Sequence, residues 1–268
     1  MRLHLAFYKF VDLVDPQAVA AWLRVLTAGL QGSILVAHEG INGVLAGDAT
    51  ALDDFKQALC ADPRFAGLRF TPSACTREPF GRMKVHVRPE IVSVGLPVSP
   101  PAGRTRTGGN AVSPAAWRRL IAEDDVVVLD NRNRFEFRLG HFKGAVDPGV
   151  SHFRDFPRYV EAHAAGWRAE GRRVAMYCTG GIRCEKTSAW MQETLGLEVW
   201  QLDGGILNYF QSLPDAERDW QGQCFVFDNR IALDTRLQPT ATTPEQVYGA
   251  EPDAEWRLAR ARRLEASA

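Results

Sequence analysis

One segment constrains this chain more than any other: residues 177–186, which read YCTGGIRCEK. The apolar residues 174–176 before it are typical of the end of a short buried strand. Residues 185–195 suit a helix that Gly196 ends. Glycines in the loop permit positive φ angles and close backbone approach. The pattern therefore predicts a tight strand-to-helix turn that carries Cys178.

That turn gives Cys178 the surroundings of a reactive thiol. We expect its sulfur to face a ring of backbone N–H groups in the active-site loop, whose residues are Thr179, Gly180, Gly181 and Ile182. The ring, the helix N-terminus and the charge of Arg183 all favour thiolate over thiol. A cysteine is more often a small buried apolar residue, but such a residue gains nothing from glycines and an arginine around it. We therefore predict that Cys178 is a nucleophile and that Arg183 supports its charge.

The spacing within the loop bears on its chemistry. Arg183 follows Cys178 by five positions, one fewer than in the cysteine phosphatases. A smaller ring of N–H groups suits a tetrahedral phosphate less well, so the spacing disfavours phosphoester hydrolysis. Cys184, at the start of the helix, either packs inward or acts as a resolving thiol.

Length and charge narrow the class of protein. The chain has 268 residues, enough for two domains. Its 32 basic and 32 acidic residues cancel, so a polyanion would have to bind a local patch. Five scattered cysteines argue against a disulfide framework and for a reducing compartment. There is no signal-peptide pattern, membrane-length apolar run, metal-ligand spacing or cofactor fingerprint, so we expect a cytoplasmic protein without membrane, metal or evident cofactor.

Residues 1–95 predict one α+β domain. Strands and helices follow in the order βαββαβ, which is typical of a ferredoxin-like sheet covered by two helices. The expected strands are 3–11, 33–37, 44–46 and a last strand or pair at 68–72 and 84–94, and the expected helices are 16–26 and 51–59. The polar residues His38, Glu39 and Asn42 fall in a predicted turn, 38–43, where turn geometry explains them better than catalysis does; substrate contact stays open.

Positive charge gathers between the two halves of the chain. Residues 77–106 contain Arg77, Arg82, Lys84, Arg88, Arg104 and Arg106 against two glutamates. The run is either a solvated basic loop or a contact for a phosphate backbone. Residues 96–111 are rich in proline and glycine, which predicts a linker.

Residues 112–215 predict a doubly wound α/β domain, with strands at 125–130, 173–177 and 198–202. Cys178 then lies beyond the carboxyl end of a strand, where such folds place their sites. Asp130, Arg132 and Glu136 are either acid–base residues or an ion-pair network around the loop. We favour the network, with Asp130 and Arg132 as supporting residues. Residues 216–268 form a C-terminal extension that is partly helical or flexible.

Several motifs, in the order in which they occur, resemble those of a known family. Asp130, Glu136 and 140–145 (GHFKGA), followed by Cys178 and its loop, are similar to the rhodanese signature. More narrowly, the chain resembles the rhodanese-domain tRNA uridine hydroxylases across about residues 5–235. The matching stretches are 38–43 (HEGING), 84–95, 140–145, 177–186, 202–206 (LDGGI) and 224–228 (CFVFD).

The resemblance implies both a fold and a reaction. The fold is a ferredoxin-like domain followed by a rhodanese-like doubly wound α/β domain. The reaction is oxygen-dependent hydroxylation of the wobble uridine to 5-hydroxyuridine, with molecular oxygen as co-substrate, the tRNA anticodon stem-loop as partner and Cys178 as the essential cysteine. Many members carry paired CxxC motifs after the segment of Cys224, whereas this chain has Thr240-Ala-Thr-Thr there.

The residues leave three functions open. A thiolate can add to C6 of uracil, because the C4 carbonyl polarises the C5–C6 bond, and leave enolate density at C5 for reaction with oxygen. The same loop suits a persulfide-forming sulfurtransferase of the rhodanese type. A non-catalytic tRNA-binding protein with an inert thiol is the third interpretation.

Overall fold

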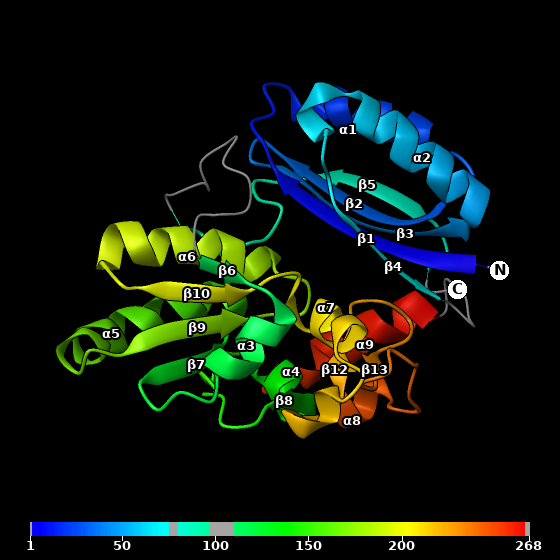
Figure 1. Cartoon of the computed structure of the whole chain (residues 1–268). Coiled ribbons are helices and arrows are strands. Elements are labelled where there is room, and N and C mark those ends of the chain that lie inside the picture. The colour runs from blue at the N-terminus through cyan, green and yellow to red at the C-terminus, as the bar shows by residue number, and fades with distance from the viewer. Residues whose placement is uncertain (1, 75–79, 97–109, 266–268) are drawn as a thin grey trace.

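The structure of the protein is a computed structural model, which describes residues 2–74, 80–96 and 110–265. Figure 1 shows two layered units, one above the other. The upper unit is a sheet whose helices lie on the face away from the lower unit, and the lower unit is a second α/β layer structure. The predicted linker, 96–111, and the basic residues Arg77, Arg104 and Arg106 fall wholly or mostly outside the described residues. The domain boundaries stay predictions.

The first unit confirms the ferredoxin-like prediction. Its sheet has the strand order β4-β1-β3-β2-β5, and helices α1 and α2 cover one face (Figure 1). The elements are β1 (Arg2–Phe10), α1 (Pro16–Leu26), β2 (Gln31–Ala37), β3 (Gly40–Asp48), α2 (Ala49–Ala61), β4 (Phe70–Ala74) and β5 (Met83–Val87). The Asp15 carboxylate caps α1 by accepting from the N–H of Ala18 at 2.9 Å, and Pro16 takes the first helical position.

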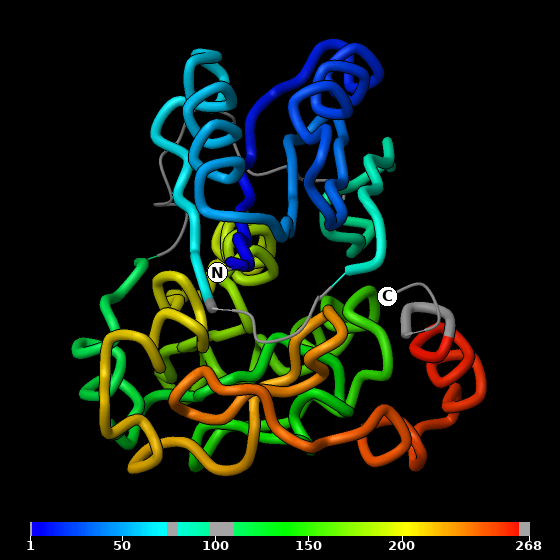
Figure 2. Tube along the Cα trace, turned by 90° about the vertical axis from the view of Figure 1, so that its right-hand side faces the viewer, coloured from blue at the N-terminus to red at the C-terminus, as the bar shows by residue number. Residues whose placement is uncertain are grey.

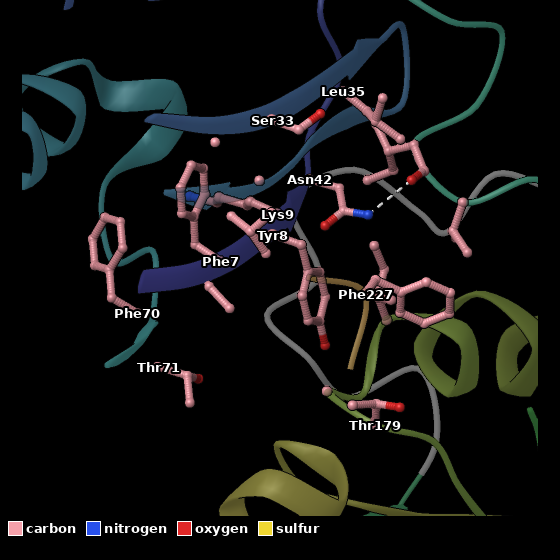
Figure 3. Close-up of a pocket in the computed structure, with 18 of the residues that line it drawn as sticks. Phe7, Tyr8, Lys9, Ser33, Leu35, Asn42, Phe70, Thr71, Thr179 and Phe227 are labelled. Carbon is pink, nitrogen blue, oxygen red and sulfur yellow. Dashed lines mark hydrogen bonds between the residues drawn. The ribbon is translucent and has the colours of Figure 1, made fainter. Parts of the chain in front are cut away.

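Alternation along the strands gives this sheet two different faces. Leu5 and Phe7 of β1 pack into the core under α1 and α2, whereas Tyr8 points to the opposite face, toward the second unit (Figure 3). The helix-free face is therefore available to form the wall of a site.

The predicted turn over 38–43 does join two antiparallel strands, β2 and β3, but it is shorter than expected: the turn is only His38-Glu39, and β3 begins at Gly40. The glycines that suggested a longer turn serve close packing within the sheet. A Cβ on Gly43 would lie 2.4 Å from the ring of Phe7, and one on Gly40 would lie 2.0 Å from the carbonyl oxygen of Lys9. Asn42 consequently sits within a strand.

The predicted strand over 84–94 is too long. Arg88 still donates its N–H to the carbonyl of Val36 at 2.9 Å, but Pro89 has no N–H to continue the ladder. The chain leaves the sheet there, and residues 90–92 run to the second unit.

The second unit is a parallel sheet with helices on both faces, which confirms the doubly wound prediction. Its order is β6-β10-β9-β7, where the strands are β6 (Asn110–Val112), β7 (Val126–Asp130), β9 (Arg173–Tyr177) and β10 (Val199–Leu202). One core lies under α3 (Pro114–Leu120) and α7 (Gly205–Ser212), and the other lies under α5 (Phe156–Ala169) and α6 (Ile182–Leu195).

Helix α6 begins at Ile182, three residues before the predicted start at 185. Gly181 caps it with a left-handed backbone, φ 98°, which disfavours any residue with a side chain. Its carbonyl accepts from the N–H of Glu185 at 3.0 Å. Arg183 therefore stands in the first helical turn rather than in the loop.

The C-terminal segment crosses the second unit and returns to the first. Its elements are β11 (Trp220–Gly222), β12 (Cys224–Phe225), β13 (Ala232–Leu233), α8 (Pro244–Tyr248) and α9 (Ala254–Glu265), and β11 pairs with β8 (Gly140–Phe142), which follows α4 (Arg134–Leu139). Arg230 donates to the hydroxyl of Ser73 at 2.9 Å, so this segment touches β4. Figure 2 shows α9, in red, at the edge of the space between the units. None of the helices in the described ranges has the length and apolar character needed to span a membrane.

Candidate active site

Cys178 follows directly after β9, at the carboxyl end of the parallel sheet. Its Sγ accepts from the N–H of Gly181 at 3.1 Å, and its carbonyl oxygen accepts from the N–H of Ile206 in α7 at 3.0 Å. A Cβ on Gly205 would lie 2.4 Å from that carbonyl oxygen. The loop is therefore held on both sides, and the sulfur has a fixed position.

The surroundings of Cys178 favour its thiolate. Burial raises the pKa, but a hydrogen bond from the Cys184 thiol, the charge of Arg183 and the N–H groups of Cys184 and Arg183 outweigh burial and lower the pKa to about 6. Burial and the neighbouring Cys178 hold the pKa of Cys184 well above its ordinary value, so Cys184 keeps its proton and donates it to this hydrogen bond. At neutral pH the resting form of Cys178 is the anion.

Arg183 is held by an acid rather than by the cysteine. Its guanidinium donates to both carboxylate oxygens of Glu136, at 2.9 and 3.1 Å, and Glu136 is fully buried. The Cζ carbon of Arg183 lies 5.4 Å from the centre of the Phe227 ring. This bidentate pair fixes a cation beside the sulfur, with an exposed aromatic ring against it.

Asp130 and Arg132 pair with each other behind the loop. The Arg132 guanidinium donates to both carboxylate oxygens of Asp130, at 2.8 and 2.6 Å, and to the carbonyl of Gly140. Both side chains have zero exposure, and neither borders the cavity between the two units. Their side chains pair with each other away from the cavity wall, and their supporting role stays a prediction.

Lys186 joins the two units, a contact that sequence patterns alone did not reveal. Its ammonium donates to both oxygens of Glu39 at 2.9 Å, to the carboxylate of Glu90 and to the carbonyl of Val92 at 3.0 Å. The lysine side chain is only 1% exposed. The sequence offered one hint of this contact: Glu39 and Lys186 each lie in one of the motifs shared with the family, 38–43 and 177–186.

A cavity of about 1780 Å³ lies between the units, and Cys178 borders it. One wall, the loop wall, is the cysteine loop together with the start of α6, residues 178–183. The other, the sheet wall, is the helix-free face of the first sheet, with Tyr8 and Asn42 (Figure 3). Nine lysine and arginine side chains line it against four carboxylates. Three of the nine, Arg82, Lys84 and Arg88, come from the predicted basic run. The cavity thus suits an anionic molecule of considerable size.

The described residues place no group of three or more histidine, cysteine or acidic side chains where it could hold a metal ion. The groups that face the cavity near the sulfur are instead backbone amides, the Arg183 cation and aromatic rings. This set suits nucleophilic chemistry on a planar, electron-poor ring.

Fold and site together define a two-domain protein in which a rhodanese-type cysteine loop faces the open sheet of a ferredoxin-like domain. Family models agree: the UPF0176 acylphosphatase-like domain matches residues 2–91, and the rhodanese-like domain matches residues 113–212. The chain belongs to the tRNA uridine(34) hydroxylase family, and it is accordingly an enzyme of the oxidoreductase type.

Three relatives establish that membership. The tRNA uridine(34) hydroxylase of Synechococcus elongatus is 49% identical over 87% of this chain and 85% of its own length. The Legionella pneumophila (strain Paris) protein of the same name is 41% identical over 91% of this chain and 94% of its own. The Deinococcus radiodurans protein of that name is 43% identical over 87% and 76%, respectively.

Proposed function

We propose that this enzyme hydroxylates C5 of the wobble uridine of tRNA, in an oxygen-dependent reaction that uses Cys178 as nucleophile. The observation that carries the proposal is a thiolate whose pKa is about 6 at the border of a large cavity rich in cations. The names of the relatives supply the substrate and the position of the uridine, 34. We place the reaction in the cytoplasm, where tRNA is available.

The first step is addition of the Cys178 thiolate to C6 of the uracil ring. The new S–C6 bond breaks the C5–C6 double bond and moves an electron pair to C5 and the C4 oxygen. The enolate carbon reacts with molecular oxygen and takes up one proton, which gives a C5 hydroperoxide. Arg183 and the amides of the loop suit this sequence because they hold the sulfur as an anion before addition and after its release.

A thiol reductant completes the reaction. Two thiol molecules convert the hydroperoxide to a C5 hydroxyl and water and become a disulfide. Loss of the C5 proton then expels Cys178 and restores the C5–C6 double bond. In sum, uridine, oxygen and two thiols give 5-hydroxyuridine, water and one disulfide.

The anticodon stem-loop is the part of tRNA that we expect to bind. Bases in an anticodon loop leave their stack at low cost, which lets a protein place one base in a pocket. Arg82, Lys84 and Arg88 line the cavity on the side of the first sheet, where they would meet phosphates. Binding should therefore weaken as salt concentration rises.

The test is mass spectrometry of tRNA nucleosides after incubation with the purified enzyme and a thiol reductant, in air and under nitrogen. We expect 5-hydroxyuridine only in air, and none with Cys178→Ala. Cys60→Ala, at a half-buried cysteine in the first unit, is the matched control and should retain the product. Product under nitrogen, or with Cys178→Ala, would contradict the mechanism. Rapid transfer of sulfur from thiosulfate to cyanide without tRNA product would instead favour a sulfurtransferase.

A further inference from the structure

Asn42 occupies a defined place on the sheet wall of the cavity. It pairs directly with Tyr8 across β3 and β1, and Ile41 beside it is fully buried in the core. Side chains alternate along a strand, so Asn42 and Tyr8 share the helix-free face and stand next to each other. Both border the same cavity as Cys178.

The amide of Asn42 is held in one orientation. Its Nδ2 donates to the carbonyl oxygen of Ile91 at 3.0 Å, and only the nitrogen of an amide can donate to a carbonyl. The oxygen therefore takes the other side, and Figure 3 shows it on the side of the Asn42 amide opposite the dashed hydrogen bond. Within the described ranges Oδ1 has no hydrogen-bond partner, and it is not among the buried unsatisfied atoms.

A short chain of contacts links Asn42 to the reactive sulfur. Tyr8 stands beside Asn42, and its hydroxyl would lie 3.0 Å from a Cβ on Gly181. The N–H of Gly181 lies 3.1 Å from Sγ of Cys178. The Tyr8 side chain thus reaches from beside Asn42 to the loop that holds the sulfur, and Asn42 and Cys178 border the same cavity. A pyrimidine base placed between the two walls would meet Cys178 on one side and Asn42 on the other.

We propose that Asn42 is the residue that distinguishes uracil from cytosine, an inference that rests on the proposed function. C6 and N3 lie on opposite sides of a pyrimidine ring, so a base with C6 at Cys178 turns N3 toward the sheet wall. Uracil presents an N3–H donor there, which Oδ1 accepts, while the second amide hydrogen serves a neighbouring carbonyl of the base. Cytosine presents a lone pair at N3, which repels Oδ1.

These hydrogen bonds also give the expected size of the preference for uracil over cytosine. A site built to hydrogen-bond one edge of a base leaves its own polar atoms unpaired when the wrong base enters. A bidentate contact of this kind typically discriminates by about 5- to 150-fold. The parent protein should bind a uridine-34 stem-loop more tightly than a cytidine-34 stem-loop by a factor in that range.

Binding under nitrogen tests the inference without turnover. Full-length protein is titrated with anticodon stem-loop RNAs that differ only at position 34: uridine, cytidine or N3-methyluridine. The methyl group removes the N3–H without disturbing the RNA fold, because position 34 is unpaired. We expect the parent to prefer uridine over both others by about 5- to 150-fold. In Asn42→Leu, which keeps the side-chain size, the three affinities should converge.

Ser33→Ala is the matched control, since Ser33 borders the cavity from the neighbouring strand β2. It should keep the preference of the parent. The inference is overturned if Asn42→Leu, shown to be folded by its circular dichroism, retains the uridine preference, or if the parent has none. These results concern binding only, so they are distinct from a failure to form 5-hydroxyuridine in air, which would count against the proposed function.

Discussion

The two walls of the cavity are built in opposite ways. The reactive groups of the loop wall, residues 178–183, are held by their neighbours: Gly181 donates to the sulfur, Ile206 donates to the Cys178 carbonyl, and Glu136 holds Arg183. On the sheet wall, Oδ1 of Asn42 has no hydrogen-bond partner among the residues that the structure describes. Atoms that react need fixed positions, whereas atoms that recognise a ligand need unused hydrogen-bonding capacity. The difference suggests a division of labour between chemistry and recognition.

That division requires the walls to be held together, and Lys186 is the main connection. It stands on α6, three residues after Arg183, and is buried against Glu39 and Glu90 of the first unit. Variants of Lys186, of Arg183 in the loop wall and of Tyr8, which joins the two walls, each test whether chemistry and recognition are divided in this way.

Lys186→Met should give the largest effect. It leaves the buried Glu39 and the partly buried Glu90 without their cation, which typically destabilises a protein by about 3–5 kcal/mol. The measurement is the free energy of unfolding from urea titration. Lys56→Met is the matched control, because Lys56 forms an exposed ion pair with Asp53 and should change stability by less than about 1 kcal/mol.

A second variant separates lost charge pairing from lost packing. If the stranded carboxylates are the cause, Lys186→Met combined with Glu39→Gln should recover part of the stability, because one buried charge is removed. Equal unfolding free energies for Lys186→Met and Lys56→Met would show that the walls do not depend on this connection.

Arg183→Met should raise the pKa of Cys178 from about 6 toward its ordinary value of 9. In the parent, half of the sulfur is thiolate near pH 6, so alkylation by iodoacetamide should rise with pH through 6 and level off above 7. In the variant this rise should occur at higher pH, because the thiolate loses its nearest cation. At pH 5 the alkylation rate should fall about tenfold for every pH unit by which the pKa of Cys178 rises.

Glu136→Gln should not raise the pKa of Cys178 as Arg183→Met does. It frees Arg183 from its carboxylate, so the pKa of Cys178 should stay or fall rather than rise. Arg69→Met removes a cation at the cavity that pairs with Asp203 and should leave the alkylation profile unchanged. A profile that responds equally to Arg183→Met and Arg69→Met would argue for a diffuse field rather than a fixed pair.

The loop wall could be predicted from the sequence and the sheet wall could not. Cys178, its glycines and Arg183 lie within six consecutive residues, so their chemistry is visible as a pattern. Arg183 looked like a partner of the sulfur, but its pairing with Glu136 depends on α4, which only the fold brings close. The sheet wall and its connection use residues from distant segments: Tyr8, Asn42 and Lys186. In addition, the glycines within β3 led us to predict a turn where the structure has a strand. Periodicity revealed both folds, because each strand and helix is a local pattern.

Tyr8→Phe should give the smallest change in stability, and it tests most directly whether the loop wall and the sheet wall are independent. The Tyr8 hydroxyl donates to the carboxylate of Glu185 in α6 at 2.9 Å, which makes it a direct contact between the walls. Loss of one such bond should lower the free energy of unfolding by about 1–2 kcal/mol. Tyr159→Phe is the matched control, because in the described part of the chain no hydrogen bond to the Tyr159 hydroxyl is found. That variant should change the free energy of unfolding by only about a few tenths of a kcal/mol.

The alkylation profile of Tyr8→Phe then decides whether the walls act independently. If the loop is fixed by its own hydrogen bonds, the pH at which Cys178 becomes reactive should stay near 6 even though stability falls. A profile that moves to higher pH in Tyr8→Phe, but not in Tyr159→Phe, would mean that the sheet wall helps to set the thiolate. Recognition of the base and activation of the sulfur would then be coupled through Tyr8, since its ring stands between Asn42 and Gly181.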